Sequence, residues 1–439
     1  MSTTPVPDVA ELTGDVAGRV ITAADPDHDA LRAGFNGMID KKPLAIVRAQ
    51  TEADAAAAIR FAREYELPLA LRSGGHSAPG FGSCDGGIVI DSRDLQQVEI
   101  DDEARTIRCG SGLTWAQFDA ATQAHGLAVT GGRVSSTGVV GLTIGSGSGW
   151  LERAMGLTSD NLIGARLVTA DGAAVDTDED RDLLWALRGG GGSFGFVTEL
   201  RFQLHPLGPI VYGGVRMYQG TRGREVLTAF RDVMSSAPRQ LAGGLAFIMA
   251  PPAPFVPEEY RGTLVAAITV LWAGDVADGL AVLDALGTPI VDTVGLTPYV
   301  DIQTHMDAGA PHGWRDYFKG GFMTDLPDVA VDAIVGIAED IRAPLTQINC
   351  APLGLDTAYA EPDESFTAIG HRDELWSFQV LSLWDDPAED SLQKAWTKTR
   401  PKSCPRTARW FPIRTFSPQT KRATSRAHTL RRSCAAFGR

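Results

Sequence analysis

Several patterns that mark common functional classes are missing from this sequence. No run of about 18 apolar residues, the length that crosses a bilayer, occurs among its 439 residues. The opening residues have neither the basic start nor the apolar stretch of a secretory signal. We therefore expect a cytoplasmic protein with no membrane-spanning helix and no membrane partner.

Cysteine is scarce as well. The five cysteines are widely spaced and include no C-x-x-C pair, so we expect neither a metal site nor a dithiol redox motif. Free buried thiols are the simplest interpretation of Cys84, Cys109 and Cys350. A formal net charge of −14 would repel nucleic acid, which leaves a small molecule as the expected partner.

The patterns that are present divide the chain into segments that differ in composition and in the secondary structure they predict. Residues 44–48 and 69–72 are short apolar runs typical of strands, and a capping-box pattern at Thr51 begins a helix between them. Beyond residue 207 tyrosines become frequent, and further strand-like runs are expected to form one antiparallel sheet. We predict an α+β chain with four parts: a lead-in at 1–38, a first domain at 39–206, a second α+β domain at 207–396 and a tail at 397–439.

The tail differs from the rest of the chain in charge. Residues 397–439 contain twelve Lys or Arg and no Asp or Glu, whereas positions 1–396 carry 28 basic and 54 acidic residues. One interpretation is a basic segment that binds an acidic partner. The other is a sequence produced by a shifted reading frame.

Glycine is unusually frequent, and many of the 48 glycines fall in three clusters. These are RSGGHS at 72–77, GVVGLTIGSGSG at 138–149 and RGGGGSFG at 188–195. Glycines let a backbone approach a ligand closely, and successive N–H groups can cradle a pyrophosphate. For His76 in the first cluster, the residues alone leave open a solvated loop position, a metal ligand or a covalent attachment point.

The third cluster contains two misleading matches. Gly190, Gly192 and Gly195 fit the spacing of the dinucleotide-binding fingerprint, and the glycines around Ser193 fit the nucleophile elbow of serine hydrolases. Both motifs follow a strand and lead into a helix. Here a helix is expected before the cluster and a strand after it, so we reject both interpretations.

Together these segments resemble the vanillyl-alcohol-oxidase-type flavoproteins with an FAD-binding PCMH-type domain, in particular the berberine-bridge-enzyme-like FAD-linked oxidases. The resemblance rests on RSGGHS, GVVGLTIGSGSGW at 138–150, GLTSDN at 156–161 and WALRGGGGSFGFVT at 185–198. It implies a two-subdomain FAD-binding PCMH-type domain, followed by an α+β substrate domain whose antiparallel sheet covers the flavin ring.

By this resemblance, FAD is bound covalently through His76. Many relatives add a second flavin bond from a cysteine, but the matching position here is Val134, so we expect a single bond. The other positions that the resemblance assigns to FAD binding are Arg72, Ser73, Gly74, Gly75, Ser77, Ser136, Thr137, Gly138, Gly141, Gly145, Gly147, Asp160, Asn161 and Val197.

The resemblance also implies hydride transfer from an alcohol or amine carbon to the flavin, with molecular oxygen as the reoxidant. Ser377 and Gln379 alternate with apolar residues on one predicted strand, so they share a face. We expect them to be catalytic. Tyr317 is a further catalytic candidate, as are His312 and His371.

Three alternatives to an oxidase stay open. The chain is either an oxidase or a flavin dehydrogenase that uses another acceptor. It could also be a defective relative, because residues 397–439 lack the tyrosine-rich ending of the family. That lack favours a shifted reading frame as the origin of the tail. A serine hydrolase around Ser193 is the weakest alternative.

Overall fold

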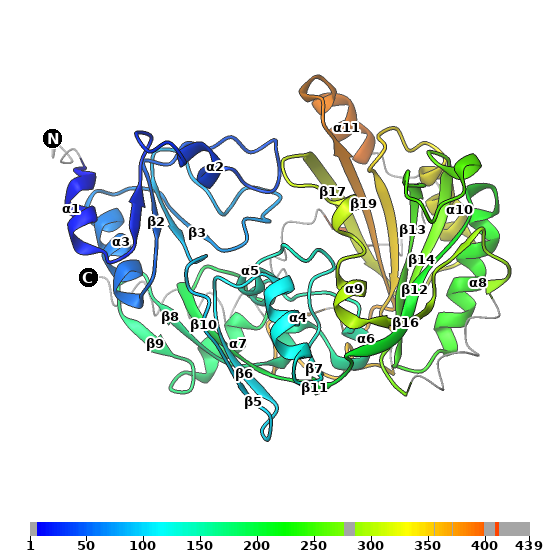
Figure 1. Cartoon of the computed structure of the whole chain (residues 1–439), viewed down its shortest axis with the longest axis horizontal. Coiled ribbons are helices and arrows are strands. Elements are labelled where there is room, and N and C mark those ends of the chain that lie inside the picture. The colour runs from blue at the N-terminus through cyan, green and yellow to red at the C-terminus, as the bar shows by residue number, and fades with distance from the viewer. Residues whose placement is uncertain (1–6, 276–285, 355, 371, 399–408, 412–439) are drawn as a thin grey trace.

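The computed structural model describes residues 7–275, 286–354, 356–370, 372–398 and 409–411. Three large sheets and a small two-stranded sheet, β11-β7, make up the described chain. In Figure 1 the first large sheet lies above the second on the left, and the third lies on the right. The first two sheets form the predicted FAD-binding part, and the third forms the substrate domain. Within the described residues, no helix is long and apolar enough to cross a membrane.

The first sheet is mostly parallel and has the order β1-β2-β4-β3. Helix α3 packs against it through an alanine-rich face, and its capping box at Thr51 is formed as predicted. Strand β1 pairs with β2, so residues 19–21 of the expected lead-in belong to this subdomain. The elements are α1 (Val9–Asp15), β1 (Arg19–Ile21), α2 (His28–Arg32), β2 (Ala45–Arg48), α3 (Glu52–Glu64), β3 (Leu69–Arg72) and β4 (Ile88–Asp91).

The second sheet is antiparallel and has the order β5-β6-β10-β8-β9. Its core contains Trp115, Phe118 and the buried thiol of Cys109. The glycine-rich segment 138–149 includes a short helix. The elements are β5 (Val98–Asp101), β6 (Thr106–Gly110), α4 (Trp115–Gln123), β7 (Leu127–Ala128), α5 (Val139–Ile144), α6 (Glu152–Met155), η1 (Thr158–Asn161), β8 (Leu162–Val168), β9 (Ala174–Asp176), α7 (Arg181–Leu187), β10 (Phe196–Gln203) and β11 (His205–Pro206).

The third sheet is antiparallel, with the order β15-β12-β14-β13-β18-β19-β17-β20 and β16 beside β12. Strand β20 lies inside the basic tail and pairs with β17. The strands are β12 (Ile210–Gln219), β13 (Leu241–Met249), β14 (Leu264–Trp272), β15 (Val291–Asp292), β16 (Gly295–Pro298), β17 (Arg315–Met323), β18 (Gln347–Pro352), β19 (Trp376–Trp384) and β20 (Arg409–Phe411). The main helices are α8 (Gly223–Ser236), α9 (Tyr299–Gln303), α10 (Asp328–Ala338) and α11 (Asp390–Thr397).

The two faces of this sheet have different neighbours. Phe378 and Val380 of β19 pack in one core with Phe230 of α8 and Ile334 of α10, and Figure 1 shows both helices on the outer side. The other face lies toward the FAD-binding part, because Ala242 packs with Trp150 there. Residues exposed on this inner face can therefore meet a ligand held between the domains.

Candidate functional site

The predicted flavin loop leaves β3 and turns at Gly75, whose φ is +76°. A Cβ placed on Gly74 would lie 2.3 Å from the nitrogen of Gly138, so the first two glycine clusters are in backbone contact. Within the described chain, the N–H groups of residues 74–77 donate to no protein acceptor. Such a run of free donors is the feature expected of a pyrophosphate cradle.

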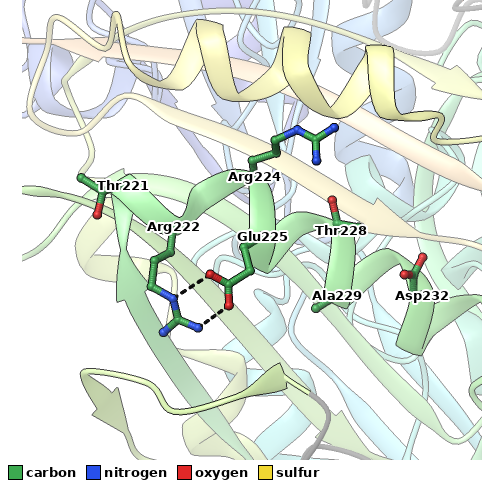
Figure 2. A pocket seen from close by; sticks show the side chains of 7 residues that line it. All are labelled: Thr221, Arg222, Arg224, Glu225, Thr228, Ala229 and Asp232. Atoms are coloured by element: carbon green, nitrogen blue, oxygen red, sulfur yellow. Dashed lines mark hydrogen bonds and ion pairs between the residues drawn. The ribbon is translucent and has the colours of Figure 1, made fainter.

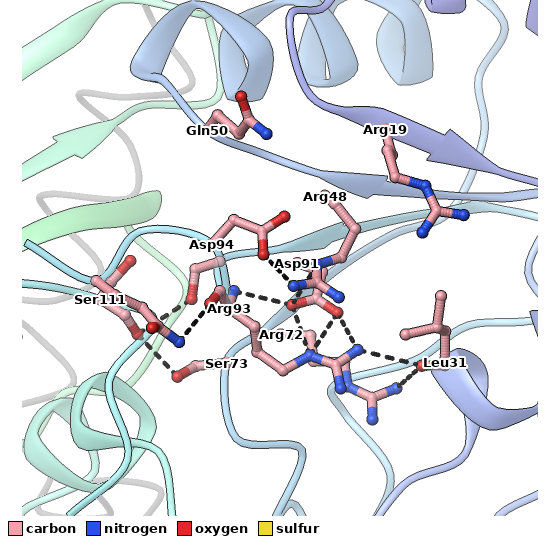
Figure 3. A network of polar contacts seen from close by, with 12 residues as sticks. Arg19, Leu31, Arg48, Gln50, Arg72, Ser73, Asp91, Arg93, Asp94 and Ser111 are labelled. Carbon is pink, nitrogen blue, oxygen red and sulfur yellow. Dashed lines mark hydrogen bonds and ion pairs between the residues drawn. The ribbon is translucent and has the colours of Figure 1, made fainter. Parts of the chain in front are cut away.

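The side chains of Arg72 and Ser73 hold this loop in place (Figure 3). Arg72 donates to the carbonyl oxygens of Leu31 at 2.7 Å and Ala33 at 2.5 Å, and its burial lowers the pKa of the guanidinium to about 10. The hydroxyl of Ser73 donates to the carbonyl of Ser111 at 2.8 Å. These protein contacts give both side chains a structural role.

His76 lies at the junction of the two clusters. Its Nε2 is 2.9 Å from the hydroxyl of Ser136, and its Nδ1 is 3.4 Å from that of Thr137. The ring of Phe35 stacks on the imidazole with centroids 4.2 Å apart. Burial, with a contribution from the neighbouring His312, lowers the pKa of His76 to about 4. The imidazole is therefore neutral at physiological pH, the form with a nucleophilic lone pair.

A segment that the sequence did not single out links this loop to the substrate domain. The N–H of Phe35 donates to the carbonyl of Gly75 at 3.0 Å. The side-chain amide of Asn36 donates to the carbonyl of Ala78 at 2.8 Å and to the carboxyl of Asp316 at 3.1 Å. Burial raises the pKa of Asp316 to about 7. Residues 35 and 36 thus fix the flavin loop relative to the start of β17.

The second cluster forms α5 and a tight turn after it. Ser146 and Gly147 have φ angles of +121° and +79°, and the hydroxyl of Thr158 donates to the carbonyl of Gly147. Gly145 caps α5. A Cβ placed on Gly141 would meet nothing within 4 Å. The space beside Gly141 and the free N–H groups of residues 74–77 fit the predicted cofactor.

Three other predicted FAD positions have protein partners. Asp160 accepts from the N–H of Leu157 and pairs with Arg372 at 2.6 Å, in a buried ion pair. Asn161 donates to the carbonyls of Met155 and Leu157. The side chain of Val197 packs in the core of the second sheet. These side chains shape the site from within the protein.

The predicted catalytic residues do not share one face. Ser377 and Gln379 lie on the inner face of β19, as expected, opposite Phe322 and Gly320 of β17. Tyr317 pairs with Ser382 and therefore lies on the outer face. Its ring is near Lys398, at the end of α11, 5.6 Å away. Tyr317, the further catalytic candidate, therefore lies on the opposite face of the sheet from Gln379, because the strand alternation directs it away from the FAD-binding part.

The remaining candidates have different outcomes. His312 makes an edge contact with Phe35, whereas His371 lies outside the described residues. Val134 accepts from the N–H of Thr137 and has no thiol for a second bond. A shallow pocket on α8 is far from these groups and is lined by polar side chains such as Arg222 and Glu225, which pair with each other (Figure 2).

The fold and the loop geometry define a flavoprotein with an FAD-binding domain followed by a substrate domain. The family model for the FAD binding domain matches residues 43–178. An FAD-linked oxidoreductase of Dictyostelium discoideum is 31% identical over 366 residues, which is 81% of this chain and 76% of that protein. The chain belongs to the FAD-linked oxidoreductases and is an oxidoreductase that uses FAD.

Two solved structures show the same fold. The 6-hydroxy-D-nicotine oxidase of Arthrobacter nicotinovorans has a TM-score of 0.81 and 22% identity, with 95% of each chain covered. The berberine-bridge-enzyme-like protein 1 of Physcomitrella patens has a TM-score of 0.79 and 20% identity, with 89% of this chain and 87% of that one covered. The architecture predicted from the resemblance is confirmed.

Proposed function

We propose that this protein is an oxidase that carries FAD on His76 and oxidises a small molecule at an alcohol or amine carbon, with molecular oxygen as the final acceptor. The observation that carries the proposal is the environment of His76. Its imidazole is neutral, is oriented by Phe35 and Ser136, and ends a loop whose N–H groups are free.

Each part of the site then has a distinct task. The N–H groups of residues 74–77 would bind the pyrophosphate, and the open space beside Gly141 would receive another part of the cofactor. His76 would hold the flavin through a ring nitrogen, and Nδ1 is the freer of the two because its protein contact is longer. Bound FAD supplies the hydride acceptor.

The inner face of the third sheet positions the substrate. Ser377 and Gln379 lie on it and can orient a substrate hydroxyl or amine. Neither residue titrates near neutral pH, so neither suits the role of general base. We assign them to positioning.

The test compares the parent protein with His76→Ala. Both are denatured, separated by electrophoresis and examined for flavin fluorescence on the protein band. Fluorescence on the parent alone supports attachment at His76, and equal fluorescence on both places the bond elsewhere. Non-covalent FAD bound by the folded parent, with a colourless denatured band, would refute the covalent part only.

Peroxide formation separates the oxidase from a dehydrogenase. Turnover under air should release about one peroxide per substrate oxidised, a ratio set by the two-electron stoichiometry of flavin oxidation. Turnover that needs an added dye and yields no peroxide would identify a dehydrogenase.

A further inference from the structure

Nine residues on β17, β18 and β19 form a continuous part of the inner face. Direct cross-strand pairing arranges them in three rows. The rows are Gln347–Leu381–Phe318, Asn349–Gln379–Gly320 and Ala351–Ser377–Phe322. Directly paired residues of an antiparallel sheet project from the same face, so all nine belong to one surface.

The middle row places two carboxamides side by side. Asn349 pairs with Gln379 across the strands, and the next residues outward are Ala246 and Gly320. Both carboxamide side chains are half-buried, and neither makes a hydrogen bond to another described residue. Because no described protein group satisfies these two carboxamides, the pair is free to bind a ligand that supplies the missing hydrogen bonds.

No residue of the three rows is charged. Asp316 lies further along β17 on the same face, but it is 4% exposed and bonded to Asn36. Lys319 and Arg315 alternate with these residues along β17, so their side chains lie on the outer face. There Arg315 pairs with Asp390. A carboxylate or ammonium group bound over the three rows would lose hydration without gaining an opposite charge from them.

We infer that Asn349 and Gln379 form the recognition pair for an uncharged substrate with an aromatic or apolar body and a carbonyl, hydroxyl or amide group. This inference rests on the proposed function, since it gives the substrate class of that site. A carboxamide both donates and accepts, so the pair can bind either partner of a hydrogen bond. Phe318 and Phe322 flank the pair and provide the apolar contact.

The test measures binding by calorimetry, with the purified full-length protein and two probes of nearly equal shape. The probes are 4-hydroxybenzamide, which is uncharged, and 4-hydroxybenzoate, which is an anion at neutral pH. We expect the benzamide to bind about tenfold more tightly, the equivalent of one hydrogen bond.

Variants then locate the binding. Asn349→Leu and Gln379→Met keep side-chain size and remove the carboxamide, so each should weaken benzamide binding about tenfold. Gln50→Met is the matched control, because Gln50 is an exposed amide in the first subdomain. It should leave binding unchanged.

Each possible result either supports or overturns the inference. A preference for the benzamide that is lost in both inner-face variants and retained in the control supports the inference. Equal binding of the two probes, binding of neither, or equal effects of all three variants would overturn it. Flavin absorbance of the same sample reports on the proposed function separately, because probe binding is measured whether or not the sample is yellow.

Discussion

The buried carboxyl of Asp316 makes a pH-dependent contribution to stability that a single substitution can isolate. Asp316 is 4% exposed and accepts a hydrogen bond from Asn36, and no described cation pairs with it. Burial alone raises its pKa from an ordinary value of 3.8 to about 7. The folded protein therefore holds a proton on Asp316 at pH values where the unfolded chain has released it.

The sign and size of the effect follow from linkage. A group whose folded pKa is raised contributes stability that is complete below its unfolded pKa and is lost as pH rises to its folded pKa. Each tenfold fall in proton concentration within that window lowers the free energy of unfolding by about 1.4 kcal/mol. Between about pH 5 and pH 8, Asp316 should therefore lower the free energy of unfolding by roughly 3 kcal/mol.

Asp316→Asn keeps the side-chain shape and its acceptor oxygen but removes the titration. The assay is urea-induced unfolding at both pH values, for parent and variant, with the same flavin content in all samples. We expect the free energy of unfolding of the variant minus that of the parent to be roughly 3 kcal/mol larger at about pH 8 than at about pH 5. Asp182→Asn, at an exposed position, is the control and should follow the parent.

Two results would refute this reasoning. One is an identical pH dependence for parent and Asp316→Asn, which would mean that the carboxylate is ionised in the folded protein. The other is a variant that is less stable than the parent at both pH values by the same amount, which would make the hydrogen bond to Asn36 specific for a carboxyl group.

Three further predictions concern the flavin loop. Asn36→Ala should reduce covalent flavin per protein several-fold more than the control Gln123→Ala does. Gln123 is a buried carboxamide elsewhere in the protein and has two backbone carbonyl partners. Equal flavin contents in the two variants would give Asn36 a purely structural role. Gly141→Ala should slightly raise the denaturation midpoint, because alanine has the higher helix propensity and its Cβ meets no protein atom, and it should lower flavin content. Gly336→Ala, equally open on α10, is the control, and equal flavin contents in both variants would mean that the cofactor does not lie beside α5. Burial lowers the pKa of His76 to about 4. Covalent incorporation of added FAD should therefore proceed equally at about pH 5 and pH 7 and fall only near pH 4. A loss of incorporation near the ordinary histidine pKa of about 6.5 would contradict the burial of the ring.

Much of the fold follows from local sequence pattern. The expected strands at 44–48 and 69–72 and the helix between them are present because short apolar runs and the capping box at Thr51 act within a few residues. The reversed order around 188–195, with a helix before and a strand after, is also confirmed. Helix α5 was missed because its glycines have low helix propensity, and β13 and β18 were missed because pairing with neighbouring strands defines them.

The site was only partly predictable. The positions of His76 and the glycine clusters follow from motifs, but the partners of His76 do not. Phe35 and Asn36 lie about 40 residues before the histidine and carry no motif. The one available signal was an asparagine and an aromatic residue next to a glycine, which is too common to identify a site.

The sequence by itself determined the cofactor class, the order of the domains and the shared face of Ser377 and Gln379, because each depends on residues close together in the chain. The tertiary structure decided which side chains meet. Only the register between β17 and β19 directs Tyr317 outward, and only the pairing of β18 with β19 brings Asn349 beside Gln379. A one-residue shift in register moves a strand's side chains to the other face, and that register is fixed by the packing of both faces of the sheet.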